Sequence, residues 1–152
     1  GQAAPTLLPI AREYSVDEHV VEQTARIPYF QAMNVLREAD MAVLLGSTDP
    51  NYTASKLYPY ILSERPLLAL FNQNSSVVDV MQATGAGSAV TYTEDEDASD
   101  LARRTERTWT TMLQQLPYRP DTDWDAFAPY TAEAMTRRQV RAFDRIVPPP
   151  SA

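Results

Sequence analysis

The stretch MAVLLGSTDPNYTASKLYPYILSERPLLALF, residues 41–71, contains two apolar runs separated by a polar loop and a helix-like segment. The runs at residues 41–45 and 66–71 have the length of strands, and their unbroken apolar character is typical of parallel strands covered on both faces. Residues 46–54 are rich in turn-forming residues, and the apolar spacing at residues 55–63 is that of a helix. The stretch therefore predicts a strand, a loop, a helix and a second, parallel strand.

The same alternation of strands and helices continues on both sides of this stretch. Pro28 and Pro129 interrupt the pattern, because proline donates no backbone hydrogen bond, and Gly85 is typical of a helix C-cap. The elements that we expect are helices at residues 7–14, 29–39, 55–63, 77–84, 98–116 and 124–147 and strands at residues 20–24, 41–45, 66–71 and 87–92. This order indicates a Rossmann-like, doubly wound α/β fold with a parallel sheet. We expect one domain over residues 1–147 and a proline-rich tail at residues 148–152.

Composition and charge limit the classes of protein to which the chain can belong. It has 152 residues, 44% of them hydrophobic, and no apolar run approaches the roughly 20 residues that a membrane span needs. A net charge of −7 disfavours general nucleic-acid binding, which depends on lysine and arginine. The absence of cysteine excludes disulfides and thiolate metal sites and is compatible with a reducing compartment. We therefore expect a soluble, cytoplasmic protein with no transmembrane segment and no nucleic-acid partner.

In a doubly wound sheet, ligands bind beyond the carboxyl ends of the strands. The useful side chains should then lie in the loops at residues 25–29, 46–55 and 72–76. The loop before residues 55–63 opens a helix, whose N-terminal N–H groups favour an anion, and Lys56 adds a full positive charge in the first turn. The alternative is that Thr53 or Ser55 merely caps this helix and that Lys56 is a surface residue.

Other candidate groups favour structural interpretations. Glycine-rich dinucleotide and P-loop motifs are absent, and His19 lies among charged residues, as a surface histidine would. The acidic residues before Trp124 lack the glycine and glutamate of a calcium loop and are expected to cap a helix, so no metal site is predicted. The tyrosines near the polar loop could stack on a base or a sugar, although aromatic residues at helical spacing usually belong to a core; they are Tyr52, Tyr58 and Tyr60.

The order of motifs resembles the carboxyl-terminal, nucleotide-sugar-binding domain of GT-B glycosyltransferases, in the broad retaining family that includes bacterial hexosyltransferases. The segment ARIPYFQAMNVLREADMAVLL resembles the family's "AD" strand and the segment before it. SKLYPYILSERPLLAL is similar to the family pattern "sKlfEylA.grPvla", and VMQATGAGSAV is similar to its closing "i...g.G..v". The resemblance covers about residues 7–147.

The resemblance implies a position for each part of a nucleotide diphospho-sugar. The phosphate end would contact Thr53, Ala54, Ser55 and Lys56. The edge of the base would contact Arg26, Ile27 and Pro28. Asp49 is the candidate for an acidic residue that the family carries upstream in the loop.

Two positions depart from the family pattern. Pro59 occupies the place of a glutamate that holds the ribose hydroxyls in the family, and proline offers no side-chain acceptor. Glu64 replaces the glycine that usually precedes the "rP" dipeptide.

The resemblance implies the donor-binding part of a glycosyltransferase that transfers a hexose-type sugar to an acceptor. Lys56 would act in catalysis by stabilising charge on the leaving diphosphate, with no further cofactor. The family's acceptor-binding domain and two of its strands have no counterpart here, so we expect a domain fragment that self-associates through exposed strand edges. The longer protein would be cytoplasmic or peripheral to a membrane. The alternative is a non-catalytic α/β binding module that has lost the nucleotide site.

Overall fold

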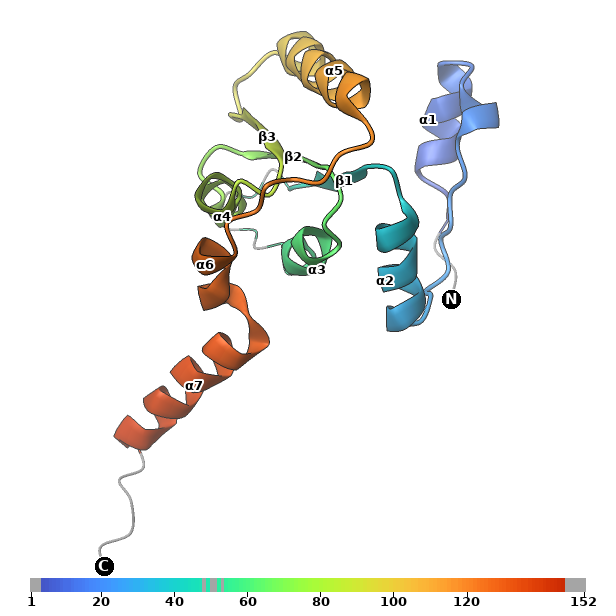
Figure 1. The fold of residues 1–152 in the computed structure, drawn as a ribbon. Helices are drawn as coiled ribbons and strands as arrows, with labels where there is room; N and C mark the ends of the chain where they lie inside the picture. The colour runs from blue at the N-terminus through green and yellow to red at the C-terminus, as the bar shows by residue number, and fades with distance from the viewer. Residues whose placement is uncertain (1–3, 48, 50–51, 53, 147–152) are drawn as a thin grey trace, which may run out of the picture. The chain divides into compact units, whose positions relative to one another are not determined.

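The computed structural model describes residues 4–47, 49, 52 and 54–146, and the chain divides into two compact units, Gly1–Val35 and Leu36–Ala152. The first unit contains α1 (Leu7–Glu13), the 3-10 helix η1 (Asp17–His19) and the start of α2 (Tyr29–Glu38). The second unit contains the sheet and the remaining helices, as Figure 1 shows by label and colour.

In the first unit, the side chain of Glu22 holds the N-terminus of α1. Its carboxylate accepts hydrogen bonds from the backbone N–H groups of Thr6, Leu7 and Leu8, at 2.7, 3.0 and 2.9 Å. These bonds, led by the one from Thr6, favour the ionised form and lower the pKa of Glu22. The negative charge also suits the positive end of the helix dipole. The cap of α1 is thus a carboxylate from a later segment of the chain.

The prediction of a strand at residues 20–24 is wrong. Val21 is 96% exposed, and the described strands pair only with one another, in the second unit. An extended segment becomes a strand only when a neighbour satisfies its backbone groups. Residues 20–24 have no such neighbouring strand among the described residues.

In the second unit, three parallel strands form a sheet in the order β1-β2-β3. The strands are β1 (Ala42–Leu45), β2 (Leu67–Asn72) and β3 (Ser88–Tyr92). The helices α3 (Leu57–Leu62) and α4 (Ser76–Thr84) connect them, and α5 (Ala98–Gln115) follows β3. Gly85 closes α4 as predicted, with φ 61° in the left-handed region.

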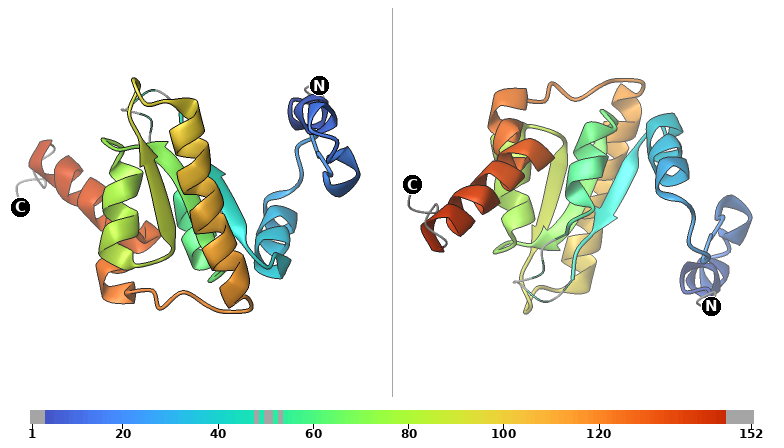
Figure 2. Two further views of the ribbon diagram at one scale, coloured as in Figure 1. Left: turned by 90° about the horizontal axis from the view of Figure 1, so that it is seen from above. Right: turned by 90° about the horizontal axis from the view of Figure 1, so that it is seen from below.

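Helices cover both faces of β2, as Figure 2 shows from two sides. Leu67, Ala69 and Phe71 belong to the larger core, together with residues of α3 and α4. Leu68 points to the opposite face and joins Met112 of α5 in a smaller core. Because successive side chains of a strand alternate, an unbroken apolar run supplies both cores. The prediction of an α/β fold with a parallel sheet is therefore confirmed, and the arrangement is consistent with a Rossmann-like fold.

The strand β1 is not buried on both faces, so this part of the prediction is wrong. Leu44 is 5% exposed, whereas Leu45 is 60% exposed and Val43 is only half-buried. The cause is position in the sheet: β1 pairs only with β2 among the described strands, while α5 packs over β3. An apolar run alone does not distinguish a central strand from an edge strand.

The C-terminal segment forms three successive helices rather than one. They are α6 (Trp124–Phe127), the 3-10 helix η2 (Ala128–Tyr130) and α7 (Ala132–Ile146), and Pro129 lies at the break, as predicted. Asp123 accepts a hydrogen bond from the backbone N–H of Ala126 at 2.9 Å and so caps α6, which confirms the capping interpretation of this acidic residue. The predicted tail at residues 148–152 lies outside the described residues.

The turn between α3 and β2 holds Glu64 in the left-handed region, with φ 55°. Glycine adopts such a conformation without steric cost, whereas a residue with a Cβ atom is strained there. The Glu64 side chain forms an exposed ion pair with Arg119 at 3.1 Å. Exposed pairs of this kind contribute little to stability.

We expect Glu64→Gly to raise the free energy of unfolding by about 0.5–1 kcal/mol, because relief of the left-handed strain exceeds the loss of the exposed ion pair. Urea denaturation followed by circular dichroism measures the change. Glu64→Ala is the matched control, since it removes the same ion pair and keeps the strain. A glycine variant no more stable than the alanine variant would contradict the expectation.

Candidate functional site

The carboxyl ends of the three parallel strands meet at one edge of the sheet. Hydrogen bonds tie the segments that follow these strands together. Tyr92 donates from its hydroxyl to the carbonyl oxygen of Ser47 at 2.9 Å, which joins the end of β3 to the loop after β1. The backbone N–H of Gln73 donates to the carbonyl oxygen of Tyr92 at 2.9 Å. This edge is therefore a connected surface to which all three strands contribute.

The turn between β2 and α4 uses its polar groups for its own structure. Asn72 is 4% exposed, and its side-chain oxygen accepts a hydrogen bond from the N–H of Asn74 at 2.9 Å. Ser75 caps α4 by accepting from the N–H of Val77 at 3.3 Å. These side chains therefore hold the turn in shape.

The loop after β1 presents the predicted phosphate-binding residues in two environments. Ala54 is buried, and its carbonyl oxygen accepts the N–H of Leu57 at 2.9 Å, whereas Ser55 and Lys56 are exposed. Lys56 itself is the N-cap of α3, and no side chain caps this helix, so Ser55 does not have the predicted capping role. Thr53 lies outside the described residues.

Lys56 is the only lysine of the chain. Its ammonium group makes no ion pair with any residue that the structure describes. An exposed, uncompensated positive charge at the start of a helix attracts an anion more strongly than either feature alone. A cation therefore lies at the start of α3, and its role in binding a phosphate stays a prediction.

The tyrosines of α3 pack against the protein. Tyr58 stacks on Tyr130, with ring centroids 5.8 Å apart, and lies near Phe127. Tyr60 packs against the larger core. Both therefore have a structural role, whereas Tyr52, before the helix, is 42% exposed. The backbone N–H of Tyr52 donates to the carbonyl oxygen of Asp49 at 3.1 Å, which makes these two residues part of one turn.

Pro59 occupies the first turn of α3. The N–H groups of a first turn have no partner within the helix, so proline fits there without the loss of a hydrogen bond. The helix therefore accepts the proline, but no carboxylate is present at this position.

The predicted base-contacting residues belong to the first unit. Arg26 and Pro28 are exposed and Ile27 is half-buried. They do not follow a strand, because residues 20–24 are not one. The structural reason for assigning them to the carboxyl edge of the sheet is therefore lost.

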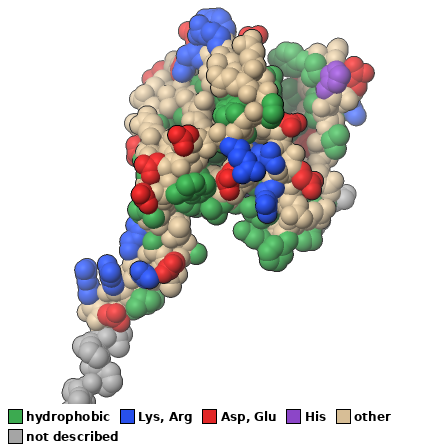
Figure 3. Space-filling model, in the orientation of Figure 1, with side chains coloured by type: hydrophobic (Ala, Val, Ile, Leu, Met, Phe, Trp, Pro, Cys, Tyr) green, Lys and Arg blue, Asp and Glu red, His purple; other side chains and the backbone are tan. Residues whose placement is uncertain are grey.

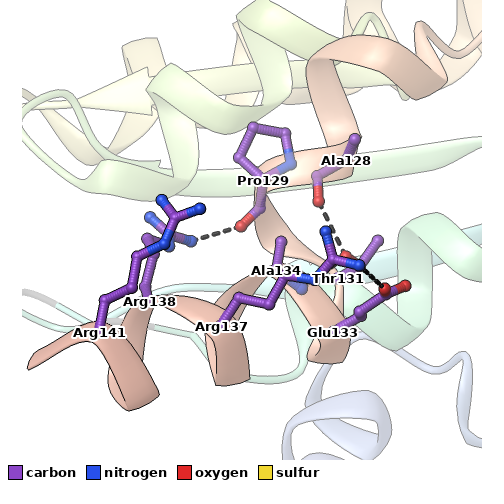
Figure 4. Close-up of a pocket in the computed structure, with 8 residues that line it drawn as sticks. All are labelled: Ala128, Pro129, Thr131, Glu133, Ala134, Arg137, Arg138 and Arg141. Atoms are coloured by element: carbon purple, nitrogen blue, oxygen red, sulfur yellow. Dashed lines mark hydrogen bonds and ion pairs between the residues drawn. The ribbon is translucent and has the colours of Figure 1, made fainter. Parts of the chain in front are cut away.

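A hollow of about 430 Å³ lies between η2 and α7 and was not predicted from the sequence. Figure 4 shows Arg137, Arg138 and Arg141 along one side of it. Arg137 pairs with Glu133 at 2.6 Å, and Arg138 donates to the carbonyl oxygen of Pro129. The spacing of these arginines along one helix is the sequence signal that could have predicted a basic surface here.

Comparison with protein-family models, curated proteins and solved structures gave no match to this chain. Within the described ranges, no three His, Asp or Glu side chains lie close enough together to hold a metal ion. Nor does any helix of those ranges have the length and apolar character needed to cross a membrane. The fold and its polar edge define a small parallel α/β unit with a cationic helix start beside β1.

Proposed function

We propose that this chain is the donor-binding part of a GT-B-type glycosyltransferase, which binds a nucleotide diphospho-sugar at the carboxyl edge of the sheet and transfers a hexose-type sugar. The observation that carries the proposal is the position of Lys56. It opens the helix that follows β1, which is one of the two edge strands in the order β1-β2-β3 of the described sheet.

The strand order supports this position. A doubly wound sheet has the order 3-2-1-4-5-6, and its ligand lies where the order reverses, beside strands 1 and 4. Three neighbouring parallel strands in chain order match either strands 1, 2 and 3 or strands 4, 5 and 6, so β1 is compared with strand 1 or strand 4, and both border the crevice. The loop after β1 is then the loop that borders the crevice.

The chemistry of the loop suits a diphosphate. The Lys56 ammonium and the N-terminus of α3 together present positive charge to a phosphate group. As the glycosidic bond breaks, negative charge grows on the leaving diphosphate, and a fixed cation there lowers the barrier without a metal ion. Lys56 is thus both a binding and a catalytic residue in this proposal.

Glu64 adds support of a different kind. Glu64 has a left-handed backbone conformation, which is one that glycine adopts readily. A glycine at this point of the family pattern would therefore suit the same turn, although the residue here is different. Pro59 counts against tight binding, because it offers no carboxylate to accept hydrogen bonds from the ribose hydroxyls.

We expect UDP, GDP or ADP to bind with millimolar or tighter affinity, and Lys56→Ala to weaken that binding at least about tenfold, the loss of roughly 1.4 kcal/mol. Isothermal titration calorimetry measures both. Arg107→Ala is the matched control, since it removes an exposed cation from α5 and should leave the affinity unchanged.

The single lysine permits a direct observation as well. Reductive methylation with ¹³C-formaldehyde keeps the positive charge and gives one lysine signal, which should shift on titration with the nucleotide and be absent from Lys56→Ala. Failure of all three nucleotides to bind would contradict the proposal and favour the alternative, a non-catalytic α/β binding module.

A further inference from the structure

The helix α7 has an apolar face that nothing in the described structure covers. None of its residues is buried, and its contacts are made mainly with η2. Its large apolar side chains are all about half exposed or more, at 47%, 49%, 57% and 76%; they are Met135, Val140, Phe143 and Ile146. At 100° per residue these side chains share one side of the helix, which is the pattern of a helix that docks in a groove.

The opposite side of α7 is basic. The helix contains four arginines and two acidic residues, a net charge of +2, so the remainder of the chain has a net charge of −9 (−7 minus +2). Figure 3 shows positively charged side chains along this helix, with an apolar patch beside them. The helix therefore differs in charge from the rest of its own chain.

An apolar groove lies on α5. It has a volume of about 470 Å³ and is almost entirely apolar apart from one carboxylate; its lining includes Leu70, Leu101, Ala102, Thr105, Glu106 and Trp109. Trp109 is 39% exposed, and Leu113, one turn further along α5, is 46% exposed. Five acidic residues precede or open α5, at positions 94–97 and 100. Glu106 is the acidic residue in the lining of the groove itself.

The helix and the groove belong to opposite faces of the sheet. The segment before α7 is anchored through Phe127 in the core that contains α3 and α4, whereas the groove adjoins Leu70 on the face that α5 covers. Only the short helix η2 separates α6 from α7. A chain's own α7 therefore starts on the wrong side of the sheet to fill its own groove.

We propose that α7 of one chain docks its apolar face in the α5 groove of a second copy, in a reciprocal two-fold dimer. The apolar side chains of α7 enter the groove, and its arginines face the acidic surface of the other copy. Two-fold symmetry repeats the contact, so one complementary pair of surfaces is used twice. An anionic lipid surface fits less well, because it repels the charge of −9 on the rest of the chain.

Sedimentation velocity of the full chain at 10–100 µM tests the proposal. We expect a mass of twice 17.0 kDa, and at least tenfold weaker association in both Phe143→Glu, on α7, and Ala102→Arg, in the groove. Val21→Glu is the matched control, because it places the same charge on a residue that is 96% exposed, and it should dimerise normally. Circular dichroism confirms that each variant is folded.

The absence of native cysteine allows the contact itself to be probed. A mixture of Phe143→Cys and Ala102→Cys chains should form a disulfide-linked heterodimer on mild oxidation, and Arg141→Cys, on the polar side of α7, should form less of it with Ala102→Cys. A monomeric wild-type chain at 100 µM, or an unaltered dimer of Phe143→Glu, would overturn the proposal. So would a monomer that binds phosphatidylserine vesicles through Phe143.

Discussion

Phe71→Ala is expected to lower the free energy of unfolding by about 4 kcal/mol. Phe71 is 1% exposed and lies in the larger core between β2 and the helices α3 and α4. Truncation removes the ring from a closely packed interior and leaves a cavity that the surrounding backbone cannot fill, so the loss of apolar burial and the cost of the cavity add together. The transition in urea should shift to a lower midpoint with little change in slope.

Leu45→Ala is the matched control for this prediction. Leu45 is also an apolar strand residue, but it is 60% exposed at the end of β1. Its truncation should lower the free energy of unfolding by less than about 1 kcal/mol, because a side chain that is already exposed loses little apolar burial. If the two variants were equally destabilised, Phe71 would not occupy the centre of the core that the structure assigns to it.

The second large effect is expected for Gly87→Ala, which should lower the free energy of unfolding by about 3 kcal/mol. A Cβ atom at Gly87 would lie 2.2 Å from the carbonyl oxygen of Leu67 and 3.0 Å from its carbonyl carbon. Both are backbone atoms, so no side chain can rotate out of the way. The start of β3 would have to move away from β2, which weakens the pairing that begins at Leu68 and Ser88.

Gly85→Ala is the control that separates this steric clash from the strain of a left-handed backbone conformation. Gly85 has φ 61°, but the nearest atom to an added Cβ is the carbonyl oxygen of Asp121, at 3.5 Å. Alanine there meets only the strain of the left-handed region, about 1 kcal/mol. Thermal and urea unfolding should therefore rank Gly87→Ala as clearly the more damaging change, and the reverse order would show that β2 and β3 are not so close at this point.

The candidate site was predicted from the sequence to different extents. Ser55 and Lys56 could be placed beside the end of β1 because a loop between a strand and a helix is a local feature. The hydrogen bond from Tyr92 to Ser47 joins residues 45 positions apart and has no local signal. Arg26 was predicted to lie at the carboxyl edge of the sheet because residues 20–24 were expected to form a strand before it. That strand does not form, because strand pairing requires a neighbouring strand and is not decided by the segment alone.

The sequence by itself determined the order and type of the elements from α2 to α5, because their apolar periodicity, prolines and helix caps act within a few residues. The tertiary structure decided which strand lies at an edge, that Glu22 caps α1, that Glu64 is left-handed and that α7 leaves its apolar face uncovered. These outcomes depend on contacts between residues far apart in the chain. The same apolar run or amphipathic pattern satisfies several such arrangements, and only packing selects one of them.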